Sequence, residues 1–352
     1  MKLGICAFPL TRSLETGRGL EKVLAEVCTE LEKSNRPFSL YESGFTKTEF
    51  EAVYKAFPFF NKLREAKDDI YLGIYPVASI FPILLKKRPL ITAVFDMIPY
   101  YVQGYDNYLK FAFKRWCIRL ACKQSDYLIV DFASNKDKII QLFNVPEDRI
   151  ALLSHLSHGV NHRLYYPEPG YKREYSLSFL GEAKRSKGMD SVIKAFRLVR
   201  EQCPEATLAL ASHGKELQQM KELARSLLPE GSYEFVGFVP EEKMREFYNT
   251  ADVFLFPSRY GMGLSSLEAM ACGTPAIVGS GQDTKDFIND PDMMVDPDNE
   301  RELADKILNL FRDRVIYRQK VAQGLALAKT YSWESMTNKY YELCQQVHRQ
   351  LK

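Results

Sequence analysis

The sequence predicts an α/β protein made of two doubly wound, Rossmann-like domains that face each other across a cleft. Short apolar runs alternate with amphipathic helical segments along the whole chain, which is typical of parallel sheets covered by helices. The 352 residues suffice for two domains with separate cores. Between the halves, the segment LYYPEPGYKREYS carries two prolines and a glycine, as expected of a linker.

The expected domains are residues 1–168 and 169–332, and a final helix covers residues 333–352. Hydrophobic residues make up 46% of the chain and charged residues 26%, which are values of globular proteins. The longest apolar stretch is interrupted by two prolines and is too short to span a bilayer. The seven cysteines show no metal-binding spacing, which favours reduced thiols in a cytoplasmic protein.

The first strand is expected in KLGICAFPL, and a turn with Gly17 and Gly19 then leads into an amphipathic helix over residues 20–31. In doubly wound domains, ligands gather at the carboxyl ends of the strands. Gly17 is therefore a candidate for main-chain contact with a ligand, although an ordinary turn needs glycine as well.

A later strand, residues 90–94, runs into the segment FDMIPYY and places Asp96 at its carboxyl end. A carboxylate at such a position is suited to accept a proton or to bind a hydroxyl group. The alternative is that Asp96 caps the next helix.

Residues 108–123 form a predicted amphipathic helix in which aromatic residues alternate with cations. Its basic face contains Lys110, Lys114, Arg115 and Arg119. Such a face fits contact with anionic lipid or with a pyrophosphate-linked acceptor, but an ordinary solvated face is the commoner case.

The second domain opens with LSFLGEAKRSKGMD, a strand that ends in a basic loop before a helix. Three cations, Lys184, Arg185 and Lys187, therefore project from the carboxyl end of a strand. Cations in that position can neutralise a diphosphate, including negative charge that grows on it during a reaction.

The most informative stretch is residues 252–286, DVFLFPSRYGMGLSSLEAMACGTPAIVGSGQDTKD. An apolar run ends at Pro257, a glycine-bearing loop follows, and Ser265 and Ser266 stand just ahead of the helix former LEAMAC. The loop from Tyr260 to Leu264 thus lies at a helix N-terminus, where main-chain N–H groups and the helix dipole favour a phosphate oxygen. The alternative is an ordinary crossover in a parallel sheet.

The segment FPSRYGMGLSSLEAMACGTPAIV resembles the signature of the retaining nucleotide-sugar glycosyltransferases with the GT-B fold. Within these, the resemblance is to the group 1, family 4-like enzymes of the bacterial cell-envelope mannosyl- and glucosyltransferase type. In that family two glutamates stand eight positions apart, the first facing the donor sugar and the second the ribose. Glu268 matches the second, and Tyr260 occupies the place of the first. The loop between them matches at Gly261, Gly263 and Leu264.

The resemblance extends to other segments. Lys187 matches a lysine of the family's phosphate-binding loop, whereas Glu182 stands where the family has an arginine. In FDMIPYY, Asp96 and Pro99 match a family turn at the mouth of the cleft. The C-terminal helix of the family crosses back onto the first domain.

The resemblance implies a retaining hexosyltransferase that moves a sugar from a nucleoside diphosphate to a hydroxyl of a glycan or lipid-linked acceptor, in surface polysaccharide or glycoconjugate synthesis. Asp96 and Lys187 are the expected catalytic residues. The donor is expected to contact Gly17, Arg185, Lys187, Tyr260, Gly261, Gly263, Leu264, Ser265 and Glu268. The family pattern implies neither a metal nor another cofactor, and nucleic acid is not an expected partner.

Two further expectations complete this interpretation. The basic first half suggests peripheral contact with an anionic membrane at its cytoplasmic face. The alternative function is a non-catalytic GT-B protein that serves as partner or scaffold of an active transferase, which the departures at Tyr260 and Glu182 favour.

Overall fold

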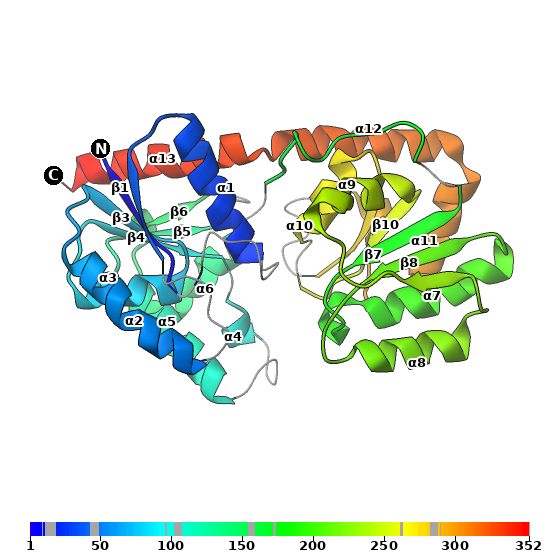
Figure 1. The fold of residues 1–352 in the computed structure, drawn as a ribbon, viewed down its shortest axis with the longest axis horizontal. Coiled ribbons are helices and arrows are strands. Elements are labelled where there is room, and N and C mark those ends of the chain that lie inside the picture. The colour runs from blue at the N-terminus through cyan, green and yellow to red at the C-terminus, as the bar shows by residue number, and fades with distance from the viewer. Residues whose placement is uncertain are drawn as a thin grey trace. The chain divides into compact units, whose positions relative to one another are not determined.

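The computed structural model describes residues 1–8, 10, 19–42, 49–95, 97–101, 108–153, 159–171, 174–260, 263–281, 288 and 290–351. The chain forms two compact units, one of residues 1–158 with 333–352 and one of residues 159–332 (Figure 1). Residues 159–168, expected in the first domain, group with the second unit. The N–H of Val160 donates to the carbonyl of Tyr331 at 2.7 Å, and the N–H of Glu168 donates to Asn249 at 2.8 Å.

The first unit contains a six-stranded parallel sheet in the order β2-β1-β3-β4-β5-β6. Its strands are β1 (Leu3–Cys6), β2 (Phe38–Tyr41), β3 (Ile70–Gly73), β4 (Leu90–Val94), β5 (Tyr127–Val130) and β6 (Ile150–Leu152). Most residues of β1, β3, β4 and β5 are buried, because helices cover both faces of the sheet and leave no solvated side.

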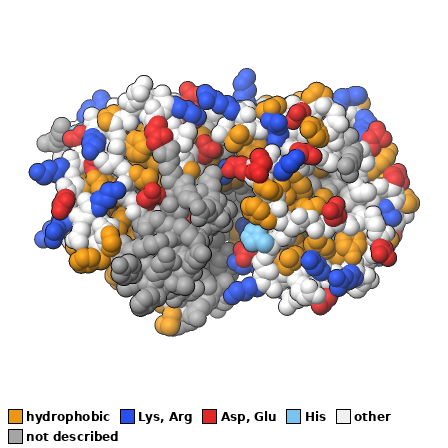
Figure 2. All heavy atoms as spheres, viewed as in Figure 1, with side chains coloured by type: hydrophobic (Ala, Val, Ile, Leu, Met, Phe, Trp, Pro, Cys, Tyr) orange, Lys and Arg blue, Asp and Glu red, His pale blue; other side chains and the backbone are white. Residues whose placement is uncertain are grey.

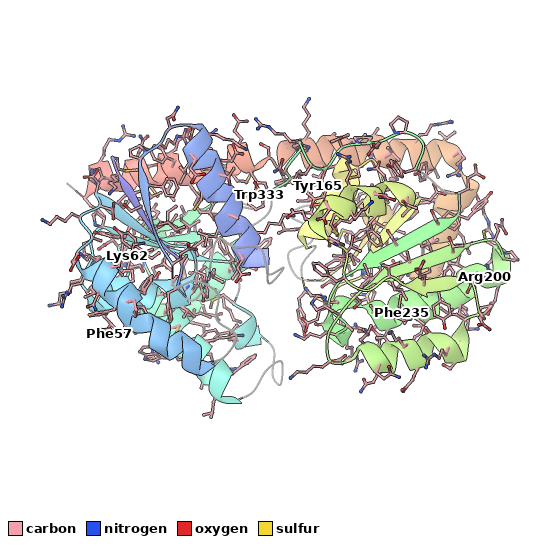
Figure 3. All side chains as sticks on the ribbon, viewed as in Figure 1. Phe57, Lys62, Tyr165, Arg200, Phe235 and Trp333 are labelled. Atoms are coloured by element: carbon pink, nitrogen blue, oxygen red, sulfur yellow. The ribbon has the colours of Figure 1, made fainter. Side chains whose placement is uncertain are left out.

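The helices of this unit are α1 (Gly19–Lys33), α2 (Glu49–Arg64), α3 (Ile80–Leu84), α4 (Ile98–Tyr101), α5 (Tyr108–Gln124), α6 (Ala133–Phe143) and α13 (Trp333–Gln350). Helices α1 and α13 lie together on one face of the sheet, and α2, α3 and α5 lie on the other (Figure 1). The side chain of Trp333, labelled in Figure 3, is buried, and so is that of Tyr340. The guanidinium of Arg36 stacks 4.5 Å above the ring of Tyr341. Helix α13 is thereby an integral part of the first unit.

The second unit contains another six-stranded parallel sheet, in the order β12-β11-β10-β7-β8-β9. Its strands are β7 (Ser176–Leu180), β8 (Thr207–Ala211), β9 (Tyr233–Phe235), β10 (Val253–Phe256), β11 (Ala276–Gly279) and β12 (Met294–Val295). Helices α7 (Met189–Gln202), α8 (Leu217–Leu227) and α11 (Glu300–Arg312) lie on one face. Helices α9 (Glu241–Thr250), α10 (Leu264–Ala271) and α12 (Arg314–Thr330) lie on the other.

Two doubly wound units with parallel sheets confirm the fold class that the alternation of strands and helices predicts. All seven cysteines are buried and outside any disulfide. Among the helices in the described ranges, none combines the length and apolar character that crossing a membrane requires.

Candidate active site

The candidate site lies in the second unit, where strands β7 and β10 are neighbours in the sheet but not in the chain. From β7 the chain moves to β8 on one side, and from β10 it moves to β11 on the other. The connections therefore diverge above the carboxyl ends of β7 and β10, and this topological switch point is where doubly wound folds bind ligands. Both segments that the sequence singles out, the basic loop and the glycine loop, start here.

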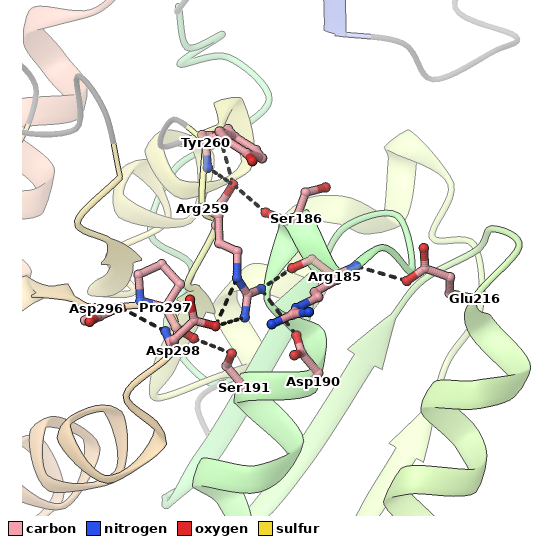
Figure 4. A network of polar contacts seen from close by, with 11 residues as sticks. Arg185, Ser186, Asp190, Ser191, Glu216, Arg259, Tyr260, Asp296, Pro297 and Asp298 are labelled. Carbon is pink, nitrogen blue, oxygen red and sulfur yellow. Dashed lines mark hydrogen bonds and ion pairs between the residues drawn. The ribbon is translucent and has the colours of Figure 1, made fainter. Parts of the chain in front are cut away.

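The two loops are tied to each other (Figure 4). A short 3-10 helix, Arg185–Lys187, follows β7, and Gly188 begins the turn into α7 with φ of +79°. A Cβ atom at Gly188 would lie 2.1 Å from the carbonyl oxygen of Pro257, so only glycine permits this approach. The carbonyl of Ser186 accepts hydrogen bonds from the N–H of Arg259 at 2.9 Å and from the hydroxyl of Ser258 at 3.3 Å.

Arg259 holds this junction together through its side chain. Its guanidinium donates to the carbonyl of Arg185 and to the carboxylate of Asp298, and it lies 3.5 Å from that of Asp190 (Figure 4). The hydrogen bond from Arg259 lowers the pKa of Asp298. Because two carboxylates neutralise its charge, Arg259 has a structural role, which is to hold the two loops together. The sequence does not single it out, since its partners lie far away in the chain.

Lys187 differs from Arg259 in having no counter-ion among the described residues. Its ammonium lies 5.5 Å from the centre of the Phe256 ring, and no carboxylate of the described chain lies within ion-pair distance. Burial lowers the pKa of Lys187. An anion placed beside this half-buried ammonium would offset its lost hydration, so the position suits a phosphate group.

The other cations of this loop have different surroundings. Lys184 forms an ion pair with Glu182 at 2.9 Å, so the acidic residue that departs from the family pattern neutralises its neighbour. The side chain of Arg185 is exposed, and its N–H donates to the carboxylate of Glu216 at 3.0 Å. Lys184 is therefore paired, whereas neither Lys187 nor the guanidinium of Arg185 has a carboxylate partner within ion-pair distance among the described residues. Of these two cations, Lys187 is half-buried and Arg185 is exposed.

Helix α10 begins at Leu264, with Gly263 as its N-cap at φ of +72°. A Cβ atom at Gly263 would lie 2.8 Å from the ring of Phe256, which explains the glycine. As a glycine, this N-cap residue makes no side-chain hydrogen bond to the helix. Ser265 and Ser266, expected ahead of the helix, lie inside its first turn and are buried, because the left-handed glycine lets the chain enter the helix earlier. The glycine N-cap supplies no side-chain acceptor to the first-turn N–H groups, which suits a phosphate site.

Glu268 lies in the second turn of α10 and is buried. One of its carboxylate oxygens accepts a hydrogen bond from the hydroxyl of Tyr248 on α9 at 2.8 Å. Complete burial and the neighbouring carboxylate raise the pKa of Tyr248 well above its usual value, so the phenol stays a donor. Tyr248 orients Glu268, and only the packing of α9 against α10 reveals this pair.

Tyr260 lies in the loop between β10 and α10. Its N–H donates to the hydroxyl oxygen of Ser258 at 3.2 Å, and its carbonyl accepts from that hydroxyl at 2.8 Å. Gly17, Asp96 and Gly261, three of the residues that the sequence nominates, lie outside the described residues. Among the residues that are described, no group of three or more His, Cys, Asp or Glu side chains is arranged as a metal site.

Comparison with known proteins agrees with this geometry. Residues 168–324 match the family model of the glycosyl transferases group 1. The chain is 29% identical over 223 residues to the O-antigen chain mannosyltransferase B of Escherichia coli, which covers 59% of this chain and 57% of the relative. It is 30% identical over 176 residues to the mannosylfructose-phosphate synthase of Agrobacterium fabrum, covering 47% and 39% respectively. The matches thus span about half the length of these relatives.

Solved structures share the whole fold at low sequence identity. A sucrose-phosphate synthase from Thermosynechococcus elongatus superposes with a TM-score of 0.80 at 17% identity and covers 99% of each chain. Anabaena HepE, solved in complex with UDP and glucose, superposes with a TM-score of 0.76 at 15% identity and covers 98% of this chain and 100% of its own.

Two doubly wound units of this kind define a GT-B protein, which the structural neighbours confirm. The predicted resemblance to the group 1 glycosyltransferases is confirmed as well, and the second unit is a domain of that family.

Proposed function

We propose that this protein is a glycosyltransferase that moves a sugar from a nucleoside diphosphate sugar to a hydroxyl of a glycan or lipid-linked acceptor, in surface polysaccharide or glycoconjugate synthesis. The observation that carries the proposal is Lys187, a half-buried cation without a described counter-ion at the switch point of a group 1 domain. The neighbouring N-terminus of α10 adds main-chain N–H groups, and its N-cap is a glycine without a capping side chain. Both features suit the diphosphate of a nucleotide sugar.

In this proposal the second unit binds the donor. Lys187 neutralises the phosphate that bears the leaving-group charge, so the interaction strengthens as the glycosidic bond of the donor breaks. The main-chain N–H groups of Gly263, Leu264 and Ser265 approach the diphosphate, and Glu268 binds the ribose hydroxyls. These contacts meet the phosphate charge without a metal.

The remaining roles rest on the family resemblance. Asp96 acts near the reacting sugar, Gly17 and Gly261 contribute main-chain contacts, and Arg185 and Tyr260 lie beside the donor. The sugar is transferred with retention of its anomeric configuration. We place the reaction in the cytoplasm, at the inner face of a membrane that holds the acceptor.

A nucleotide screen tests the proposal. Purified protein is titrated calorimetrically with UDP, GDP, TDP and ADP and with their common sugar conjugates, and the titrations are repeated with Lys187→Ala and Glu268→Ala. We expect one nucleotide to bind and both substitutions to weaken it. Lys184→Ala is the matched control, because Lys184 is already paired with Glu182 and its loss should leave affinity within about twofold.

Two outcomes would contradict the proposal. If no nucleotide binds up to millimolar concentration, the departures at Tyr260 and Glu182 have removed the donor site, and the protein is a non-catalytic GT-B partner of another transferase. If a nucleotide binds but Lys187→Ala and Lys184→Ala weaken it equally, Lys187 is not the phosphate contact. Once the donor is known, NMR of the product's anomeric carbon tests retention.

A further inference from the structure

Residues 257–259, which follow β10, form a tightly packed junction between the loops of three strands. The carbonyl oxygen of each residue, taken in order, lies 2.1 Å from a Cβ atom added to Gly188, 2.0 Å from one added to Gly279 and 2.6 Å from one added to Gly281. Gly188 precedes α7 in the loop after β7, whereas Gly279 ends β11 and Gly281 follows it. Only glycine fits at these three points, so the packing fixes the three backbones relative to one another.

Ser258 lies at the centre of this junction and is fully buried. Its hydroxyl donates to the carbonyl of Tyr260 at 2.8 Å and to the carbonyl of Ser186 at 3.3 Å. It also accepts a hydrogen bond from the N–H of Tyr260 at 3.2 Å. A hydroxyl has one proton, so the two carbonyls share it. The hydroxyl of Ser258 thereby joins the loop after β7 to the loop before α10.

The two segments that this hydroxyl joins lead directly to the proposed donor contacts. Ser186 is followed at once by Lys187, the half-buried cation. Tyr260 is followed three residues later by Gly263, the N-cap of α10. Ser186 and Ser258 are 72 residues apart in the chain. The distance between Lys187 and the N-terminus of α10 therefore depends on the contacts within the junction.

A diphosphate needs these two contacts at a fixed distance from each other. Arg259 and the three glycines already hold the loops together, so the hydroxyl of Ser258 adds to the placement of the contacts. A broad basic surface could bind a diphosphate without such placement. On the face drawn in Figure 2, however, Lys and Arg side chains stand among Asp and Glu side chains. Affinity then depends on how a few contacts are positioned.

We propose that Ser258 is a positioning residue for donor binding, whose shared hydroxyl sets the distance between Lys187 and the N-terminus of α10 so that both contact one diphosphate. This inference rests on the proposed transferase function and adds to it a residue that touches neither donor nor acceptor. Loss of the hydroxyl should leave the fold intact and let the two contacts shift relative to each other. The loss in affinity should therefore depend on the presence of Lys187.

A double-mutant cycle tests this dependence. Full-length protein is titrated calorimetrically with the nucleoside diphosphate that wild type binds, and Ser258→Ala is made in wild type, in Lys187→Ala and in Glu268→Ala. In wild type we expect Ser258→Ala to weaken binding about fivefold, which corresponds to one neutral hydrogen bond. In Lys187→Ala the same change should weaken binding less than about twofold, because the contact that it positions is gone. In Glu268→Ala, which removes a ribose contact, the fivefold effect should persist.

The matched control is Ser178→Ala in β7. Ser178 is 1% exposed, and its hydroxyl has no hydrogen-bond partner among the described residues, so this change should leave affinity within about twofold. Ser258→Cys keeps the shape of the side chain with weaker hydrogen bonding, and its affinity should lie between those of wild type and Ser258→Ala. It replaces Ser258→Ala in the cycle if the alanine variant does not fold.

The outcomes separate this inference from the proposed function. If wild type binds no nucleoside diphosphate, both are overturned. If wild type binds one and the effects of Ser258→Ala and Lys187→Ala simply multiply, Ser258 has a structural role alone and the transferase proposal stands. The positioning role is likewise overturned if Ser258→Ala binds the nucleotide as tightly as wild type does.

Discussion

The two units share one architecture, but the residues that sheet packing does not explain lie in different places in each. In the second unit they lie at the carboxyl ends of β7 and β10, where Arg259 is paired and Lys187 is not. In the first unit they lie on the outer face of α5. The comparison of α5 with α7 is instructive, since α7 buries Val192, Phe196 and Val199 and exposes charged residues such as Lys194. Covering a sheet requires one apolar face, so the second apolar face of α5 needs a separate explanation.

This difference teaches that the ligand site and the exposed face of α5 are encoded by separate parts of the sequence. Changes at the switch point should affect nucleotide binding, and changes on the exposed face of α5 should leave it intact. The following substitutions test this separation.

The largest effect is expected from Gly188→Ala. The new Cβ atom would overlap the carbonyl oxygen of Pro257, and φ of +79° is itself unfavourable for alanine. We expect the free energy of unfolding to fall by about 2–4 kcal/mol in urea titration, together with loss of nucleotide binding. Gly231→Ala is a matched control, because Gly231 has φ of +80° with nothing within 4 Å of the added atom. It should cost only about 1 kcal/mol, and equal losses for both variants would show that the loop contact is unimportant.

Next comes Lys187→Met, for which stability and binding should change in opposite directions. Burial lowers the pKa of Lys187 in the folded protein. At any pH below the pKa of an exposed lysine, the buried ammonium therefore reduces the free energy of unfolding. That cost is largest at neutral pH and declines as the pH rises through the lowered pKa. We expect Lys187→Met to raise the free energy of unfolding by up to about 1 kcal/mol at pH 7, and to weaken nucleotide binding by about tenfold or more. Thermal unfolding measured from pH 7 to pH 10.5 checks the sign, and a gain that grows with pH would contradict it.

A smaller effect is expected from Tyr248→Phe. This change leaves buried Glu268 without the phenol as donor, which should cost about 1–3 kcal/mol of stability. If Glu268 binds the ribose, wild type should prefer a ribonucleotide to its 2′-deoxy form, and the variant should lose part of that preference. Tyr317→Phe removes another buried hydroxyl of the same unit, one that donates to the carbonyl of Asp252 at 3.3 Å. Unchanged ribose preference in Tyr248→Phe would show that Tyr248 has a structural role alone.

The smallest effect on folding is expected from a double variant of α5, Phe113→Gln with Trp116→Gln. Because these rings are exposed, the free energy of unfolding should change by less than about 0.5 kcal/mol. Chemical denaturation checks this, and nucleotide affinity should equal that of wild type. A loss above about 2 kcal/mol would mean that the two rings are packed against the protein itself.

Local sequence patterns predicted the elements that depend on short-range chemistry. The strands at residues 90–94 and 253–256 were expected at the positions where the structure has them, because apolar runs bounded by polar residues specify a buried strand locally. The helix expected at 108–123 agrees with α5 to one residue. The cations after β7 and the glycine loop after β10 were likewise visible as motifs.

The sequence alone therefore determined the succession of strands and helices, the two doubly wound sheets and the residue types at the switch point, since periodicity and turn chemistry act over a few residues. Only the tertiary structure decided which cation is paired and which is not, because Arg259 meets Asp298 and Asp190 across 39 and 69 residues of chain. It also decided which face of α5 is buried. A helix with apolar residues on two sides does not reveal in its sequence which side the sheet will bury, and burial depends on the partner surface.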